Sequence, residues 1–76
     1  MTDIGTFDLV TLGQRIRHAR KVKGLTLTEL ATSVGRAPSL LSQIENGRRE
    51  PRLALLRSLA DALDVSINDL VDPSPP

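Results

Sequence analysis

The chain has 76 residues, a net charge of +1 and no cysteine. This length fits one domain, and the composition excludes disulfides, thiolate zinc sites and, because His18 is the only histidine, a multi-histidine metal centre. No apolar run approaches the roughly 20 residues of a membrane-spanning helix, and the first residues lack a signal-peptide pattern, so we expect a cytoplasmic protein without a metal or membrane partner.

The charges are unevenly distributed along the chain. All ten lysines and arginines lie between Arg15 and Arg57, and that span contains only three acids, which gives it a net charge of +7. The other six acids lie outside it. A basic middle with acidic ends is typical of a surface that binds phosphates, although an ordinary solvated surface would have the same composition.

Residues 1–10 are expected to form a flexible N-terminal arm. Thr11 and Gln14 have the spacing of a capping box, so the first helix is predicted to begin at Thr11. Gly24 is expected to end it. Between these residues, three apolar side chains recur at helical spacing and predict a face turned toward a core: Leu12, Ile16 and Ala19.

The next stretch reads as two short helices joined by a tight turn. Thr26 and Glu29 form a second capping box at the start of the first of them. Gly35 follows, where a left-handed conformation can turn the chain sharply. Pro38 suits the first position of the second helix, which is predicted to run to about Glu45. This pattern is that of a helix-turn-helix, whose second helix can enter the major groove of DNA.

A basic loop over residues 48–51 leads to a fourth predicted helix, over residues 52–63. Ser66 is expected to cap a short fifth helix. Residues 72–76 are rich in proline and read as a tail or linker. The sequence therefore predicts an all-α, five-helix domain over residues 11–71, with no strand.

Three segments match a known family in order and spacing: GQRIRHARKVKGLTLTELA, LLSQIENGRREP and LADALDVSINDL. Over Leu12 to Val71 the chain resembles the Cro/XRE-type helix-turn-helix family, which includes the phage repressor DNA-binding domains. The resemblance implies a compact repressor-like domain without a cofactor. It would bind double-stranded DNA in transcriptional regulation, as a homodimer on a palindromic site, with Pro38–Glu45 as the recognition helix.

The resemblance also assigns roles by position. The positions that face DNA bases are occupied by Pro38, Ser39, Leu40 and Gln43. The positions that contact phosphates are occupied by Thr26, Asn46 and Arg48. Arg20 and Glu45 match a pair that often bridges the first helix and the end of the recognition helix. Two residues depart from the family pattern. Leu27 occupies a position where glutamine is common, and Ala37 occupies one where serine or threonine is common.

The side chains themselves support part of this assignment. Ser39 and Gln43 are four residues apart, so they share one helix face. A glutamine can make two hydrogen bonds to adenine, so we expect at least one A·T pair read by Gln43, although both side chains could be plain exposed polar groups. Further cations are candidates for phosphate contact or could be solvated charges: Arg49, Arg36, Arg52 and Arg15.

No catalytic motif is present, so we expect no enzyme. A dimer surface is expected in the region of the fourth and fifth helices, at Val65, Ile67, Leu70 and Val71, unless these residues complete the core of one subunit. Two other interpretations remain open. The same helical domain could bind a protein partner, or it could be the DNA-binding part of a longer ligand-sensing regulator.

Overall fold

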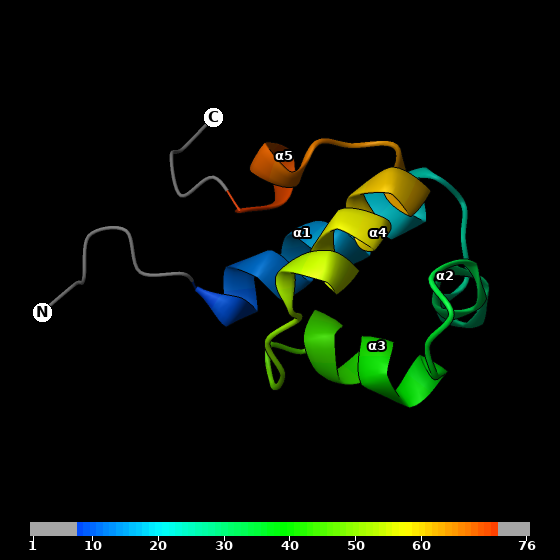
Figure 1. Cartoon of the computed structure of the whole chain (residues 1–76), viewed down its shortest axis with the longest axis horizontal. Coiled ribbons are helices and arrows are strands. Elements are labelled where there is room, and N and C mark those ends of the chain that lie inside the picture. Colours follow the sequence, from blue (N-terminus) through cyan, green and yellow to red (C-terminus); the bar gives the residue numbers. More distant parts are fainter. Residues whose placement is uncertain (1–7, 72–76) are drawn as a thin grey trace, which may run out of the picture.

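The computed structural model describes residues 8–71, which form five helices and no strand. The helices are α1 (Leu9–Val22), α2 (Leu27–Ser33), α3 (Pro38–Glu45), α4 (Leu53–Leu63) and α5 (Ile67–Val71). Helices α1 and α4 lie in the middle of the domain, with α3 on one side and α5 on the other, and α2 packs against α3 (Figure 1). The prediction of an all-α, five-helix domain is confirmed.

The first helix begins at Leu9, two residues earlier than predicted, because Asp8 and not Thr11 is its N-cap. The Asp8 carboxylate accepts hydrogen bonds from the Val10 amide at 3.0 Å and from the Thr11 hydroxyl at 2.7 Å. The predicted capping box at Thr11 is therefore wrong. These bonds, chiefly the one from the Thr11 side chain, hold the pKa of Asp8 below its usual value. The rest of the predicted arm, residues 1–7, and the predicted tail, residues 72–76, lie outside the described residues.

The start of α2 confirms the second capping box. The Thr26 hydroxyl accepts from the Glu29 amide at 3.0 Å, and the Glu29 carboxylate accepts from the Thr26 amide at 2.8 Å. After α2, Gly35 has a φ of +68°, in the left-handed region, which other residues adopt only at a cost in free energy. The chain then turns into α3, which begins at Pro38 and has no side-chain cap because Ala37 precedes it.

The apolar stripes of the helices meet in one core. Helix α4 supplies five of its twelve buried apolar residues, so α4 is the element around which the others pack. Leu53, the first residue of α4, is 58% exposed, whereas Leu55 is buried. Leu70, predicted as part of a dimer surface, is only 2% exposed and belongs to the core. The core consists of Leu12, Ile16, Leu30, Ala31, Leu41, Ile44, Leu55, Leu56, Leu59, Ala60, Leu63 and Leu70.

Helix α1 crosses the end of α3 at very short range, and Gly13 makes this possible. A Cβ atom at Gly13 would overlap the carbonyl oxygens of Ile44 and Glu45. Since these are backbone atoms, no rotation of a side chain could relieve the overlap. The absence of a side chain at Gly13 therefore sets the distance between α1 and the carboxyl end of α3.

An ion pair joins the same two helices. The Arg20 Nε and Nη2 atoms donate to the two carboxylate oxygens of Glu45 at 2.7 and 3.1 Å. The Arg20 Nη1 atom donates to the Leu25 carbonyl at 2.9 Å, so one guanidinium also holds the chain between α1 and α2. Glu45 is only 8% exposed, and its hydrogen bonds to Arg20 raise the pKa of that arginine. The two residues thus form the bridge that their positions in the sequence predicted.

Replacing Gly13 with alanine tests the close crossing of α1 and α3. Overpacking a tight contact costs about 1–3 kcal/mol, and the gain in helix propensity from glycine to alanine offsets about 1 kcal/mol of that. We expect Gly13→Ala to lower the free energy of unfolding in urea by about 2 kcal/mol. The control is Gln14→Ala at the exposed neighbouring position, which should change it by less than about 0.5 kcal/mol. Equal stability of the two variants would contradict the close crossing.

Replacing Arg20 with methionine tests the ion pair. The variant leaves the Glu45 carboxylate largely buried without its partner, so the free energy of unfolding should fall by about 3 kcal/mol. The double variant Arg20→Met/Glu45→Leu leaves no buried charge and should regain most of that loss. Arg17→Met, at an exposed position on α1, is the control. If Arg20→Met were no less stable than Arg17→Met in urea unfolding, the pair would have no structural role.

Candidate nucleic-acid interface

One face of α3 is open to solvent. Leu41 and Ile44 on its other face are buried, whereas Pro38, Ser39 and Gln43 are exposed. Ser39 and Gln43 lie one helical turn apart, so their polar side chains project from the same face. Three of the four side chains predicted to contact bases are therefore accessible to a ligand.

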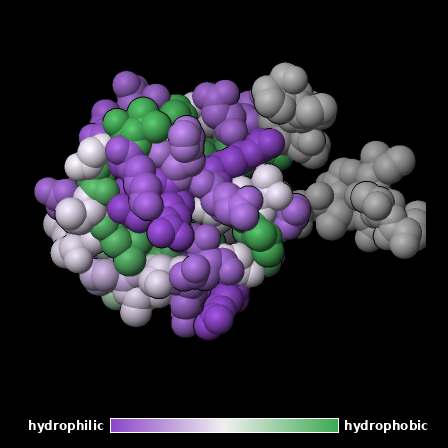
Figure 2. Space-filling view, turned by 180° about the vertical axis from the view of Figure 1, so that it is seen from behind, coloured by the Kyte–Doolittle hydropathy of each residue, from purple (hydrophilic) through white to green (hydrophobic). Residues whose placement is uncertain are grey.

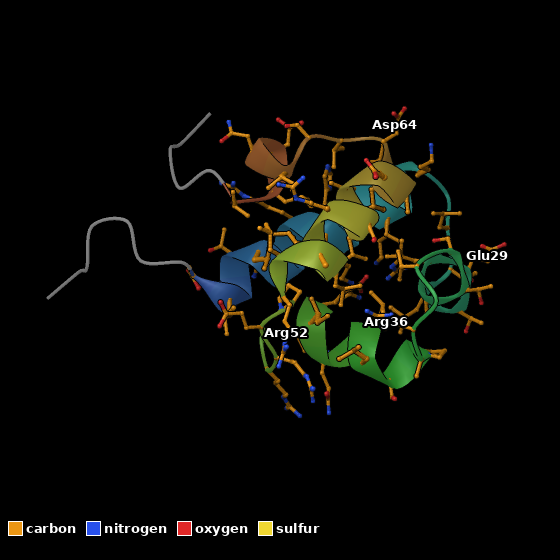
Figure 3. All side chains as sticks on the ribbon, in the orientation of Figure 1. Glu29, Arg36, Arg52 and Asp64 are labelled. Carbon is orange, nitrogen blue, oxygen red and sulfur yellow. The ribbon has the colours of Figure 1, made fainter. Side chains whose placement is uncertain are left out.

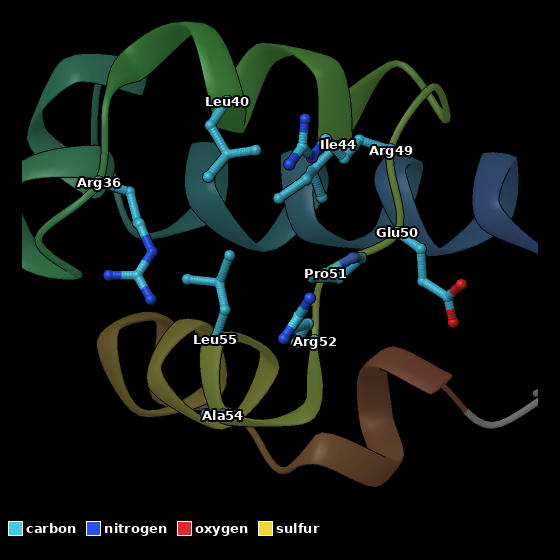
Figure 4. Close-up of a pocket in the computed structure, with 9 residues that line it drawn as sticks. All are labelled: Arg36, Leu40, Ile44, Arg49, Glu50, Pro51, Arg52, Ala54 and Leu55. Carbon is cyan, nitrogen blue, oxygen red and sulfur yellow. The ribbon is translucent and has the colours of Figure 1, made fainter.

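Leu40, the fourth, is placed differently. It is half-buried and packs against the hydrophobic core. Its side chain points toward Leu55 on α4, across the space between the two helices (Figure 4). Leu40 therefore does not share the open face of Gln43, and we remove it from the set of base-contacting residues.

A hollow of about 390 Å³ lies between α3 and α4. Its apolar side includes Leu40 and Leu55, and its other lining residues include three arginines that come from different parts of the chain. Arg36 comes from the turn before α3, Arg49 from the loop after it, and Arg52 from the residue that precedes α4. Glu50 lines the hollow as well, but its side chain points away from the apolar pair (Figure 4).

Arginines gather on this side of the domain. Arg36 and Arg52 lie beside α3, whereas Asp64 lies at the opposite end of α4 from Arg52 and Glu29 lies on α2 (Figure 3). Guanidinium groups carry a permanent charge and several donors in a fixed plane, which suits them to phosphate oxygens. The fold thus places three of the arginines predicted to contact phosphates next to the open face of α3.

The remaining polar candidates are exposed around the ends of α2 and α3. The Thr26 hydroxyl accepts from the Glu29 amide and still has its own proton to donate. The Asn46 side-chain nitrogen donates to the Ser42 carbonyl at 2.8 Å and to the Ser42 hydroxyl at 3.4 Å, and the longer of these bonds could be exchanged for one to another acceptor. The backbone amide of Arg48 donates to the Gln43 carbonyl at 2.9 Å, so Arg48 follows directly on the end of α3.

Arg15 belongs to a different part of the molecule. Its guanidinium donates to the Asp69 carbonyl of α5 at 3.5 Å, and α5 lies across the domain from α3 (Figure 1). We therefore place Arg15 outside this interface, as a residue that links α1 to α5.

The residues predicted for a dimer surface are divided by the structure. Leu70 is in the core, whereas Val65, Ile67 and Val71 are half-buried and pack against it. Val22, at the end of α1, is 75% exposed and had not been predicted as a surface feature. Val22 follows two cations at the end of α1, and nothing in this local sequence indicates whether its side chain is buried or exposed.

Residues 8–71 lack two further features. Within this part of the chain, no group of three or more histidines, aspartates or glutamates is arranged to hold a metal ion. None of the helices described there has both the length and the apolar character needed to cross a membrane.

Known proteins are similar to this chain in sequence and in fold. A family model for a helix-turn-helix domain matches residues 11–72. The HTH-type transcriptional regulator YazB of Bacillus subtilis is 41% identical over 61 residues, which is 80% of this chain and 88% of YazB. The HTH-type transcriptional regulator SinR of the same species is 45% identical over 62 residues, which is 80% of this chain but 56% of SinR.

Solved structures agree with the sequence comparisons. The restriction-modification controller protein C.AhdI from Aeromonas hydrophila superposes with a TM-score of 0.80 at 40% identity, covering 83% of this chain and 96% of that protein. A crystal structure of SinR in complex with DNA superposes with a TM-score of 0.74 at 43% identity, covering 78% of this chain and 98% of the SinR chain. On these matches in sequence and in structure, the chain belongs to the helix-turn-helix domain family, among regulators of the Cro/XRE type.

Proposed function

We propose that this domain binds double-stranded DNA sequence-specifically and acts in transcriptional regulation, with α3 as its recognition helix in the major groove. The observation that carries the proposal is the open face of α3, where Ser39 and Gln43 are exposed, next to a hollow lined by three arginines. A relative with 43% identity, SinR, has been solved in complex with DNA. In a cell without a nucleus, such a function also favours a cytoplasmic location, because the chromosome lies there.

Bases would be read chiefly by Gln43. Its amide can donate to and accept from the major-groove edge of adenine at the same time, whereas the Ser39 hydroxyl can bond several bases and therefore discriminates less. Pro38 offers only an apolar surface at the start of the helix. The sequence preference of the domain should thus be strongest at the base pair opposite Gln43.

Phosphates would be held on both sides of α3. Arg36, Arg49 and Arg52 line the hollow between α3 and α4, and Arg48 lies at the end of α3. Thr26 lies at the amino end of α2, where backbone amides and the helix dipole also favour an anion. These contacts position a protein on the duplex without reading its sequence.

A homodimer on a palindromic site is part of this proposal. Two domains related by a two-fold axis match the symmetry of a palindrome. Ile67 and Val71 are four residues apart on α5, so they share a face, and both remain half-exposed after they pack against the core. With the exposed Leu53 of α4, they are the best candidates for the contact between the two subunits.

Replacing Gln43 with alanine tests the reading of bases. The variant should lose about 1–3 kcal/mol of discrimination at one base pair of its preferred site and keep its preferences elsewhere. The measurement is selection of binding sites from random duplexes, followed by affinities for single-base changes. Gln14→Ala, an exposed glutamine on α1, is the matched control. If Gln43→Ala kept the full preference at every base pair, α3 would not be reading the site through this residue.

Replacing Arg48 or Arg49 with glutamine tests the phosphate contacts. Each contact releases counterions, so the logarithm of the affinity should fall with the logarithm of the salt concentration, and each variant should reduce that slope by roughly 1. Arg57→Gln, on the exposed side of α4, should leave the slope unchanged. A native affinity that did not change with salt would contradict the proposal directly.

A further inference from the structure

A second hollow lies between the carboxyl ends of α1 and α4, and the proposed function does not use it. We call it the α1–α4 hollow. Its volume is about 390 Å³. Asp64 on its edge lies at the far end of α4 from Arg52, away from α3 (Figure 3). The residues that line it are His18, Ala19, Val22, Lys23, Leu63, Asp64 and Val65.

Three of the residues that line this hollow are large and apolar: Val22, Leu63 and Val65. Val22 is 75% exposed, more than Val10 or Leu53, the other large apolar side chains exposed in the described part of the chain. It lies beside Leu63 and Val65, so a ligand there could cover apolar surface on both helices. Helix α1 lies behind α4 in Figure 1, and the view from behind shows small hydrophobic patches within a largely hydrophilic surface (Figure 2).

Opposite charges border this apolar surface. Lys23 follows the end of α1 and Asp64 follows the end of α4, and both are exposed. Within residues 8–71, neither side chain takes part in an ion pair. The lining of the α1–α4 hollow therefore includes a cation from the end of α1, an anion from the end of α4 and apolar side chains from both, together with His18.

We propose that a second copy of this chain docks on the α1–α4 hollow around a two-fold axis. In such an arrangement each surface must carry both members of every contact pair, and this one does. Lys23 of each copy would face Asp64 of the other, and each Val22 would enter the hollow of the other copy. Neither Ile67 nor Val71 lines the hollow, so this contact is separate from the dimer surface proposed on α5.

This contact is expected to be weak in solution. Seven residues line the hollow, whereas a stable interface uses about 20–30 residues on each side. A weak contact becomes significant when two copies are held close together, because their effective concentration then reaches the order of millimolar. Copies bound at neighbouring positions on one duplex would be held in this way, a consequence that rests on the proposed function.

A reciprocal charge exchange tests the proposal. Lys23→Glu alone places two acids opposite each other across the two-fold axis, and Asp64→Lys alone places two lysines there. An equimolar mixture restores two attractive pairs, so its association should be about tenfold tighter than that of either variant alone. Sedimentation equilibrium at high protein concentration and low salt measures this, and circular dichroism verifies that each variant is folded. Asp64→Asn, which tolerates the left-handed backbone at this position, should reduce the native association.

The matched control makes the same charge changes on the same helices outside the hollow. Lys21→Glu and Asp61→Lys are at exposed positions, and mixing them should give no gain. The proposal is overturned if the Lys23 and Asp64 variants gain nothing on mixing, or if the control pair gains as much. Adding Ile67→Glu to every protein separates the two surfaces, because loss of the α5 dimer lowers all masses alike and leaves the gain on mixing unchanged.

Discussion

The placement of the recognition helix depends on how α1 holds its carboxyl end. At Gly13 the two backbones come together without an intervening side chain, and at Arg20 a guanidinium grips the Glu45 carboxylate. Helix α3 has eight residues and no side-chain cap at its start. A helix this short is unstable on its own in water, so its direction is set by its neighbours. The direction of the exposed face of α3 is thus set by contacts on its opposite, buried side.

The two sides of α3 have different tasks. Leu41 and Ile44 are buried and fix the helix in the core. Gln43 is exposed, so its side-chain amide is accessible to a ligand. Leu40 lies on the border between these two sides and points toward Leu55. The two leucines form part of the apolar lining of the hollow between α3 and α4, which three arginines also line. The arginines that line this hollow therefore border an apolar surface.

Local signals predicted most of the fold. The Thr26 capping box, the turn at Gly35 and the proline at the start of α3 are decided by residues within a few positions, and each is present as predicted. The start of α1 was missed because Asp8 and Thr11 are both good caps, and the sequence alone does not rank them. Gly13 carried a signal that was overlooked: a glycine inside a helix costs about 1 kcal/mol and usually has a packing reason.

We remove Arg15 and Leu40 from the predicted DNA contacts for the same reason. Residues distant in the sequence determine where these two side chains lie. Arg15 donates to a carbonyl 54 residues away, and no pattern within α1 indicates that partner. Leu40 points toward Leu55 of α4, and the spacing of apolar residues along α3 does not indicate that neighbour. Residue type and helical spacing could identify the candidates for contact with DNA, but the packing of α4 and α5 decides which of them face outward.

The hydrogen bond from the Arg48 amide to the Gln43 carbonyl has a consequence for how such a domain can change its target. It makes Arg48 an extension of α3, so Gln43 and Arg48, the residues that we propose to contact a base and a phosphate, are held in a fixed relation to each other. An insertion directly after α3 would change the position of Arg48 relative to Gln43. Divergence in target preference should consequently proceed by exchanging the exposed side chains of α3, while the length of the segment after it stays constant.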